Sequence, residues 1–95
     1  MDKKDEWRIA LHKAIAYFGE DQQVTKAVEE MAELIKALVD PRIKEPAIIS
    51  EIADCLIMLW QLAIIFGESE VINKIEYKLG RLAQKIDEET AADLC

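Results

Sequence analysis

The sequence predicts an all-α fold of four helices in a single domain spanning residues 1–95. Apolar residues recur at helical spacing along most of the chain, no alternating strand pattern competes with them, and Gly and Pro separate the apolar segments. A chain of 95 residues with 52% hydrophobic residues can fill one core but is too short for two.

The first two helices are expected at about residues 3–18 and 22–39. Gly19 stands where a left-handed cap would end the first, and Asp21 is a suitable N-cap for the second. The apolar stripe of the first helix is Trp7, Leu11, Ala14, Ile15 and Phe18. That of the second is Val24, Val28, Met31, Ile35 and Leu38.

The other two helices are expected at about residues 46–66 and 69–88. Pro46 suits the first helical position of one, Ser69 can cap the other, and the polar tail after residue 88 is expected to fray. The apolar stripe of the last helix is Ile72, Ile75, Leu79, Leu82 and Ile86.

The 46–66 helix is apolar all round from Ile52 onward. Such a helix must be covered on every side, and three partners with single stripes hardly enclose it in a monomer. We therefore expect a four-helix bundle completed by homo-oligomerisation, as a homodimer or homotetramer. The alternative is a monomeric bundle with an exposed apolar patch.

Charge and cysteine usage exclude several function classes. The formal net charge of −7 opposes binding to a nucleic acid polymer, whose backbone attracts cations. Cys55 and Cys95 form neither a disulfide framework nor a metal-binding spacing, which favours a reducing, cytoplasmic setting. The N-terminus lacks a signal-peptide pattern, and the unbroken apolar runs fall short of the roughly 20 residues of a membrane span.

Two pairs of carboxylates recur at a spacing of three residues. Glu30 and Glu33 lie on the 22–39 helix, and Glu51 and Asp54 lie near the start of the apolar 46–66 helix. Helical geometry places Glu30 at the edge of the core face and Glu33 on the adjacent flank, whereas Glu29 and Lys36 point outward. Taken alone, Glu29, Glu30 and Glu33 are better explained by a solvated acidic face than by a metal site.

Convergence of the four carboxylates would be unfavourable without a counter-charge, because like charges beside an apolar helix repel and lose hydration. A divalent cation removes this conflict. Hard oxygen ligands on two facing helices suit Mg²⁺, with Mn²⁺ as the alternative, and both metals share their ligands with phosphate.

A basic row follows the 69–88 helix beside its apolar stripe. Its members are Lys74, Lys78, Arg81 and Lys85. The row is either a solvated rim that covers the core edge or a binding surface for the phosphates of a metal-chelated nucleotide. Gly80, in the middle of this helix, indicates close packing or close approach of a ligand.

With these residues in place, the chain resembles the MazG-like group of all-α nucleotide pyrophosphohydrolases. The resemblance rests on Glu30-x-x-Glu33 within "EEMAEL", on Glu51-x-x-Asp54 within "EIAD", and on Lys78 and Arg81 within "KLGRL". It covers most of the chain. One departure is that Leu82 and Ala83 stand where many members have Asn and further basic residues, so nucleotide selectivity is not carried over.

The resemblance implies hydrolysis of a nucleoside triphosphate between its α and β phosphates, giving the monophosphate and pyrophosphate. Glu30, Glu51 and Asp54 are then expected mainly to ligate Mg²⁺, and Glu33 to ligate it and to act as general base. Lys78 and Arg81 are expected to bind the β and γ phosphates, with Lys74 as a weaker candidate. A wall for stacking the base could come from Trp7, Tyr17 or Phe18, although core packing explains Trp7 and Phe18 equally well.

Three other functions compete with this interpretation. A carboxylate-bridged di-iron bundle needs Glu-x-x-His on two helices, and the single His12 has no such partner. A non-enzymatic nucleotide-sensing or oligomerisation module would keep the same residues without turnover. Phosphoribosyl-ATP pyrophosphohydrolase is a third candidate, although a free-standing chain with this spacer favours a general house-cleaning enzyme.

Overall fold

The structure is a computed structural model that describes residues 2–94, and this range is all-helical. It contains four helices: α1 (Lys3–Phe18), α2 (Glu20–Val39), α3 (Glu45–Phe66) and α4 (Glu68–Leu94). The predicted all-α class and the number of helices are therefore confirmed. Cys95 lies outside the described range.

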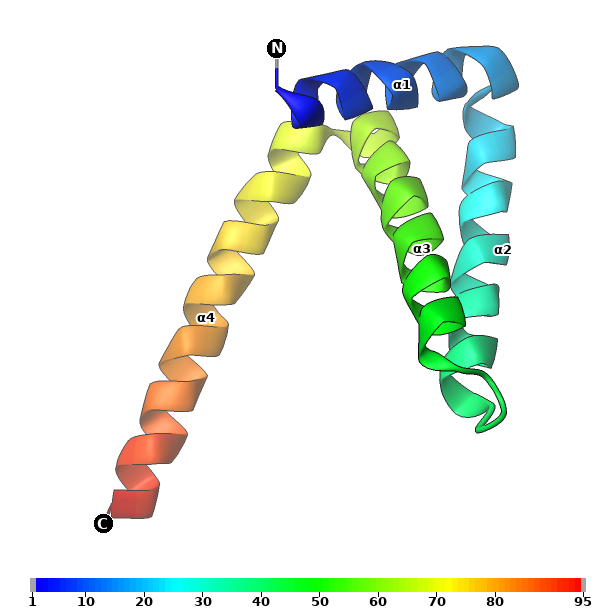
Figure 1. The fold of residues 1–95 in the computed structure, drawn as a ribbon. Coiled ribbons are helices and arrows are strands. Elements are labelled where there is room, and N and C mark those ends of the chain that lie inside the picture. The colour runs from blue at the N-terminus through cyan, green and yellow to red at the C-terminus, as the bar shows by residue number, and fades with distance from the viewer. Residues whose placement is uncertain (1, 95) are drawn as a thin grey trace.

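The arrangement of the helices is open (Figure 1). α2 and α3 form an antiparallel pair, α1 crosses one end of this pair, and α4 leaves from the same end and diverges from α3 (Figure 1). The radius of gyration is 17.3 Å, whereas a compact chain of this length has about 12 Å. Within one chain, then, α4 does not close a bundle with the other three helices.

Single glycines join α1 to α2 and α3 to α4. Gly19 has a φ of 90°, and its backbone N–H donates to the carbonyl of Ile15 at 2.8 Å. Gly67 has a φ of 124° and caps α3 in the same way, through the carbonyl of Ala63. Because a glycine with positive φ changes the direction of the chain within one residue, the next helix begins at once.

These short connections shift the predicted helix boundaries. α2 begins at Glu20, so Asp21 lies in its first turn and is not the N-cap. α4 begins at Glu68, which places Ser69 inside the helix, and it continues to Leu94 instead of fraying after residue 88. Pro46 is the second residue of α3, close to its expected position.

The buried core lies mainly in the seam between α2 and α3. α2 contributes Gln23, Ala27 and Ala37; α3 contributes Cys55, Met58 and Gln61. The two alanines allow the helices to approach closely, and the side-chain amide of Gln23 donates to Oε1 of Gln61 at 2.6 Å. This seam places Glu30 in the middle of the face of α2 that contacts α3, not at its edge.

The larger apolar residues predicted to form the core are mostly exposed. At 100° per residue, Leu38 lies about 60° around α2 from the middle of the buried seam, and Val28 and Ile35 lie about 120–140° from it. On α1 only Leu11 is buried, and Trp7 is 55% exposed. The physical reason is that Ala27 and Ala37 permit the closest helix contact, which leaves the bulky side chains on an adjacent face.

α3 is covered by α2 along one side and by α1 at its C-terminal end, and much of its remaining surface is exposed. Among residues 2–94, it is the single helix long and apolar enough to cross a membrane, and 17% of its apolar 18-residue stretch is buried. This is weak support for a membrane location, because central helices of soluble proteins meet the same criteria.

Candidate functional site

The antiparallel seam brings the two acidic pairs together. Gln23 lies opposite Gln61, and two turns further along α2 and back along α3 the facing residues are Glu30 and Asp54. Carboxylate oxygens of Glu30, Glu51 and Asp54 all lie within 4.8 Å of one another. We call these three residues the acidic cluster. It contains three of the four metal ligands predicted from the sequence.

Glu33, the fourth predicted ligand, lies outside this group of oxygens. It is exposed on α2, one turn beyond Glu30. Its charge nevertheless reaches the cluster, because it contributes to raising the pKa of Glu51. Glu33 therefore stands at the solvent edge of the cluster.

The pKa of the Glu51 carboxyl is raised above its ordinary value of 4.5. Partial burial is the largest cause, followed by the negative charges of Asp54, Glu30 and Glu33. Both effects disfavour the ionised form. A cation beside Glu51 would favour its ionised form.

Lys26 lies beside this cluster and was not predicted as part of it. Its Nζ is 3.1 Å from Oε1 of Glu30 and 3.9 Å from Oε2 of Glu29. The hydrogen bond to Glu30 is the largest cause of a raised pKa at Lys26, and Asp54 adds to it. The signal in the sequence is the spacing of four residues between Lys26 and Glu30 on one helix face.

The acidic cluster fits a hard divalent cation by ligand chemistry and by size. Its donors are carboxylate oxygens, as Mg²⁺ and Mn²⁺ prefer. Around Mg²⁺, neighbouring ligand oxygens lie about 3 Å apart and opposite ones about 4.2 Å apart. The separation of up to 4.8 Å is close to this range, so modest side-chain rotation would allow the three residues to share one ion.

The predicted phosphate-binding residues lie on α4. Lys74, Lys78 and Arg81 are exposed and, together with Tyr77 and Lys85, line an open surface hollow of about 570 Å³. α4 diverges from the pair of helices that carries the acidic cluster (Figure 1). A single chain therefore presents the acidic cluster and the basic row on different arms.

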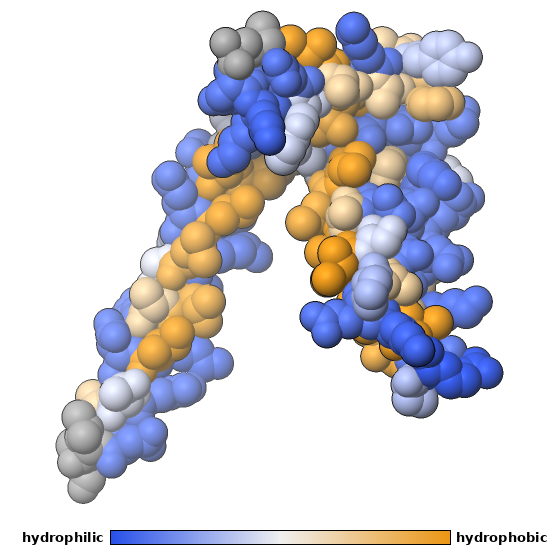
Figure 2. All heavy atoms as spheres, in the orientation of Figure 1, coloured by the Kyte–Doolittle hydropathy of each residue, from blue (hydrophilic) through white to orange (hydrophobic). Residues whose placement is uncertain are grey.

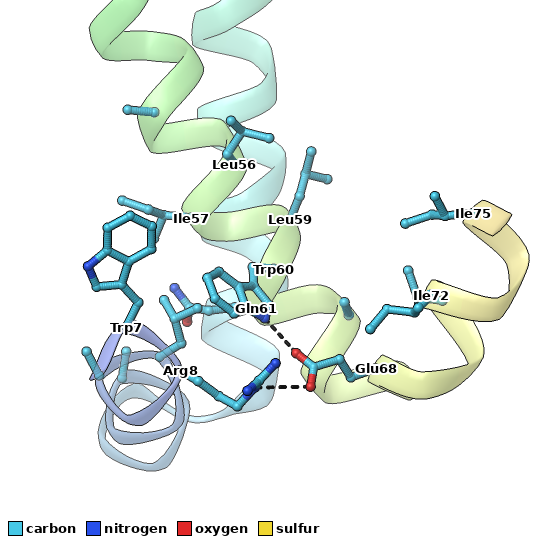
Figure 3. Close-up of a pocket in the computed structure, with 16 residues that line it drawn as sticks. Trp7, Arg8, Leu56, Ile57, Leu59, Trp60, Gln61, Glu68, Ile72 and Ile75 are labelled. Atoms are coloured by element: carbon cyan, nitrogen blue, oxygen red, sulfur yellow. Dashed lines mark hydrogen bonds and ion pairs between the residues drawn. The ribbon is translucent and has the colours of Figure 1, made fainter. Parts of the chain in front are cut away.

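An apolar groove lies between these arms. It has a volume of about 1060 Å³ and is lined by residues of α1, α3 and the first half of α4. Figure 3 shows Trp7, Ile57 and Trp60 on one side of this groove and Ile72 and Ile75 of α4 on the other. Trp7 thus faces the groove and is not part of a core within one chain.

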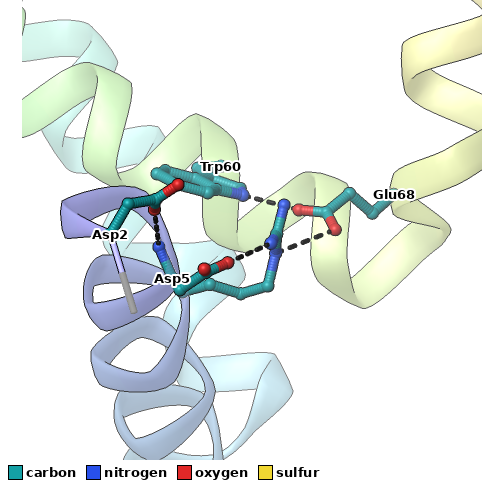
Figure 4. A network of polar contacts seen from close by, with 5 residues as sticks. Asp2, Asp5, Trp60 and Glu68 are labelled. Carbon is teal, nitrogen blue, oxygen red and sulfur yellow. Dashed lines mark hydrogen bonds and ion pairs between the residues drawn. The ribbon is translucent and has the colours of Figure 1, made fainter.

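A polar network fixes α4 at the closed end of the groove (Figure 4). The indole N–H of Trp60 donates to Oε2 of Glu68 at 2.6 Å. Nε of Arg8 lies 3.2 Å from Oε1 of Glu68, as an ion pair without an aligned hydrogen bond, and its guanidinium lies over the Trp60 ring. The network joins α1, α3 and α4 at one point.

The other candidates for base stacking are at the far end of α1. The rings of Tyr17 and Phe18 contact each other edge to face, with centroids 4.9 Å apart. Both residues are exposed, so the core does not account for Phe18 within one chain.

Comparisons with protein-family models, curated proteins and solved structures found no match to this chain.

Proposed function

We propose that the protein is a metal-dependent nucleoside triphosphate pyrophosphohydrolase of the MazG-like type. The reaction is cleavage between the α and β phosphates to give a nucleoside monophosphate and pyrophosphate. The observation that carries the proposal is that Glu30, Glu51 and Asp54, from both acidic motifs, have oxygens within 4.8 Å of one another. We further propose a role in removing unwanted nucleotides in the cytoplasm, as a homodimer or homotetramer without membrane association. The net charge of −7 supports the absence of a nucleic acid polymer among its partners.

Glu30, Glu51 and Asp54 would hold Mg²⁺ or Mn²⁺, with Glu33 as an additional ligand at the solvent edge. When bound, the metal would neutralise phosphate charge and polarise the α-phosphoryl group. The raised pKa of Glu51 supports this role, because a cation is what favours its ionised form.

Glu33 is proposed to orient the attacking water and to accept its proton. Its exposed position beside the cluster leaves room for water, and a carboxylate without a close cationic partner can act as a base. Lys78 and Arg81 bind the β and γ phosphates, and Lys74 extends this row.

The test is release of pyrophosphate from a panel of nucleoside and deoxynucleoside triphosphates with Mg²⁺ or Mn²⁺. We expect metal-dependent release by the native protein and its loss in Glu51→Gln. Glu33→Gln should lose turnover while nucleotide binding is retained, and full activity of that variant would refute its role as base.

A second candidate is a nucleotide-sensing module that binds without turnover. The separation of the acidic cluster and the basic row on different arms of one chain favours it. Metal-dependent nucleotide binding with no product on any nucleotide would support this candidate. Phosphoribosyl-ATP belongs in the same panel, because cleavage of that compound alone would indicate the biosynthetic enzyme.

A further inference from the structure

We infer that the apolar groove and the apolar stripe of α4 together form the interface with a second copy of this chain. The α4 stripe consists of Ile72, Ile75, Leu79, Leu82 and Ile86, and each of these residues is exposed. Figure 2 shows apolar residues along the side of α4 that faces α3 and along the opposing side of α3. Ile72 and Ile75 line the groove opposite α3, and Leu79, Leu82 and Ile86 continue the apolar surface along α4 beyond it.

The exposed area matches what an extensive homodimer buries. The chain exposes 7713 Å², whereas a compact monomer of 10.8 kDa exposes about 5,500 Å². The excess of about 2,200 Å² per chain lies in the range of obligate dimer interfaces, which bury about 1,000–2,500 Å² per partner. It is well above the roughly 800 Å² per partner of a standard-size complex.

The distribution of charge also favours a second copy. On α4 the basic row lies roughly a quarter turn from the apolar stripe, so it borders any partner that covers the stripe. On α3, Asp54 lies about 60° around the helix from Ile57 at the edge of the groove, whereas Glu51 faces the seam with α2. A second copy placed in the groove can set the basic row of one chain near Asp54 of the other, which pairs opposite charges at the rim of the interface.

Closure of the groove by α4 of the same chain is disfavoured by the polar network at its base. Arg8 and Trp60 both contact Glu68, the first residue of α4, and so hold that helix at its observed angle. Swinging α4 onto α3 would have to break these contacts.

A bilayer is also a poorer occupant than a second copy. α3 carries Glu51 and Asp54 within its length, and α4 carries charged residues on both sides of its stripe. Placing these carboxylates in hydrocarbon is costly, whereas a second copy leaves them at the rim in water.

The experiment measures the mass of the full-length native chain by light scattering, over a range of concentrations, without nucleotide or added metal. We expect twice the chain mass of 10.8 kDa, or four times if dimers pair further. The variant Leu79→Glu/Leu82→Glu places charge in the middle of the stripe and is expected to give monomers. The control Tyr77→Glu alters a residue of similar exposure on the opposite side of α4, and it should keep the native mass.

A folded native monomer at all concentrations would overturn the inference. So would a native chain that floats with phosphatidylcholine vesicles, because the groove would then be covered by lipid. If the double variant unfolds, the mass of the native chain still shows whether it forms a dimer. The result is separable from the proposed hydrolysis: an inactive dimer refutes the function alone, and an active monomer refutes the interface alone.

Discussion

The buried glutamine pair provides a quantitative test of how the seam positions the acidic cluster. Gln23 and Gln61 are buried and hydrogen-bonded at 2.6 Å across α2 and α3, two turns from Glu30 and Asp54. Replacing Gln61 with Leu leaves the amide of Gln23 buried without its partner, which costs about 1–3 kcal/mol. Replacing both with Leu removes both polar groups, and we expect that double variant to be close to the native stability.

Urea unfolding at one fixed chain concentration measures this effect. A loss of 2 kcal/mol shifts the unfolding midpoint by about 1 M for a small domain. The two single variants should each unfold at lower urea, and the double variant should recover most of the loss. If the losses of the single variants simply add in the double variant, the hydrogen bond does not couple the two helices and does not set the register of Glu30 against Asp54.

The remaining predictions concern the acidic cluster and two glycines: Gly67, between α3 and α4, and Gly80, within α4. Folding raises the pKa of Glu51 above 4.5, so the folded metal-free protein holds the carboxyl proton more tightly than the unfolded chain does. Its free energy of unfolding should therefore fall as pH rises from 4.5 through the raised pKa of Glu51. Calorimetric scans across this pH range should show a smaller fall for Glu51→Gln, and identical profiles for the two proteins would contradict the prediction. Lys26→Met removes a cation that competes for Glu30, so calorimetric titration should give a modestly lower Kd for Mg²⁺, and weaker binding would contradict this. Gly67 has a φ of 124°, so Gly67→Ala should lower the free energy of unfolding, measured in urea, by about 1–3 kcal/mol. A Cβ added at Gly80 meets no other atom within 4 Å, so Gly80→Ala should raise the free energy of unfolding by about 0.5–1 kcal/mol. A lower free energy of unfolding would indicate that a partner or ligand approaches this position closely.

The helices and the convergence of the acidic motifs could be predicted from local patterns. Helical spacing, glycines and prolines define where helices run, and a spacing of three residues places Glu51 and Asp54 on one face. Two antiparallel helices joined by a short loop then bring Glu30 opposite them. These features depend on neighbours close in sequence, which explains why the sequence is sufficient for them.

The rotation of α2 and the angle of α4 could not be predicted in this way. The bulkiest apolar residues of α2 predicted a core that contains Val28 and Ile35, whereas the residues buried in the close-packed seam are Ala27 and Ala37. The one available signal was Gln61, a polar residue within an apolar run, which indicates a buried polar contact. The angle of α4 depends on contacts of Glu68 with residues distant in sequence, which no local pattern reveals.

The most direct test of the central claim is the identity of the products formed from a nucleoside triphosphate in heavy-oxygen water, followed by phosphorus NMR. The proposed site predicts nucleoside monophosphate and pyrophosphate, with the heavy oxygen on the monophosphate, only when Mg²⁺ or Mn²⁺ is present and only with Glu51 intact. A nucleoside diphosphate with inorganic phosphate, or the same products from Glu51→Gln, would contradict it.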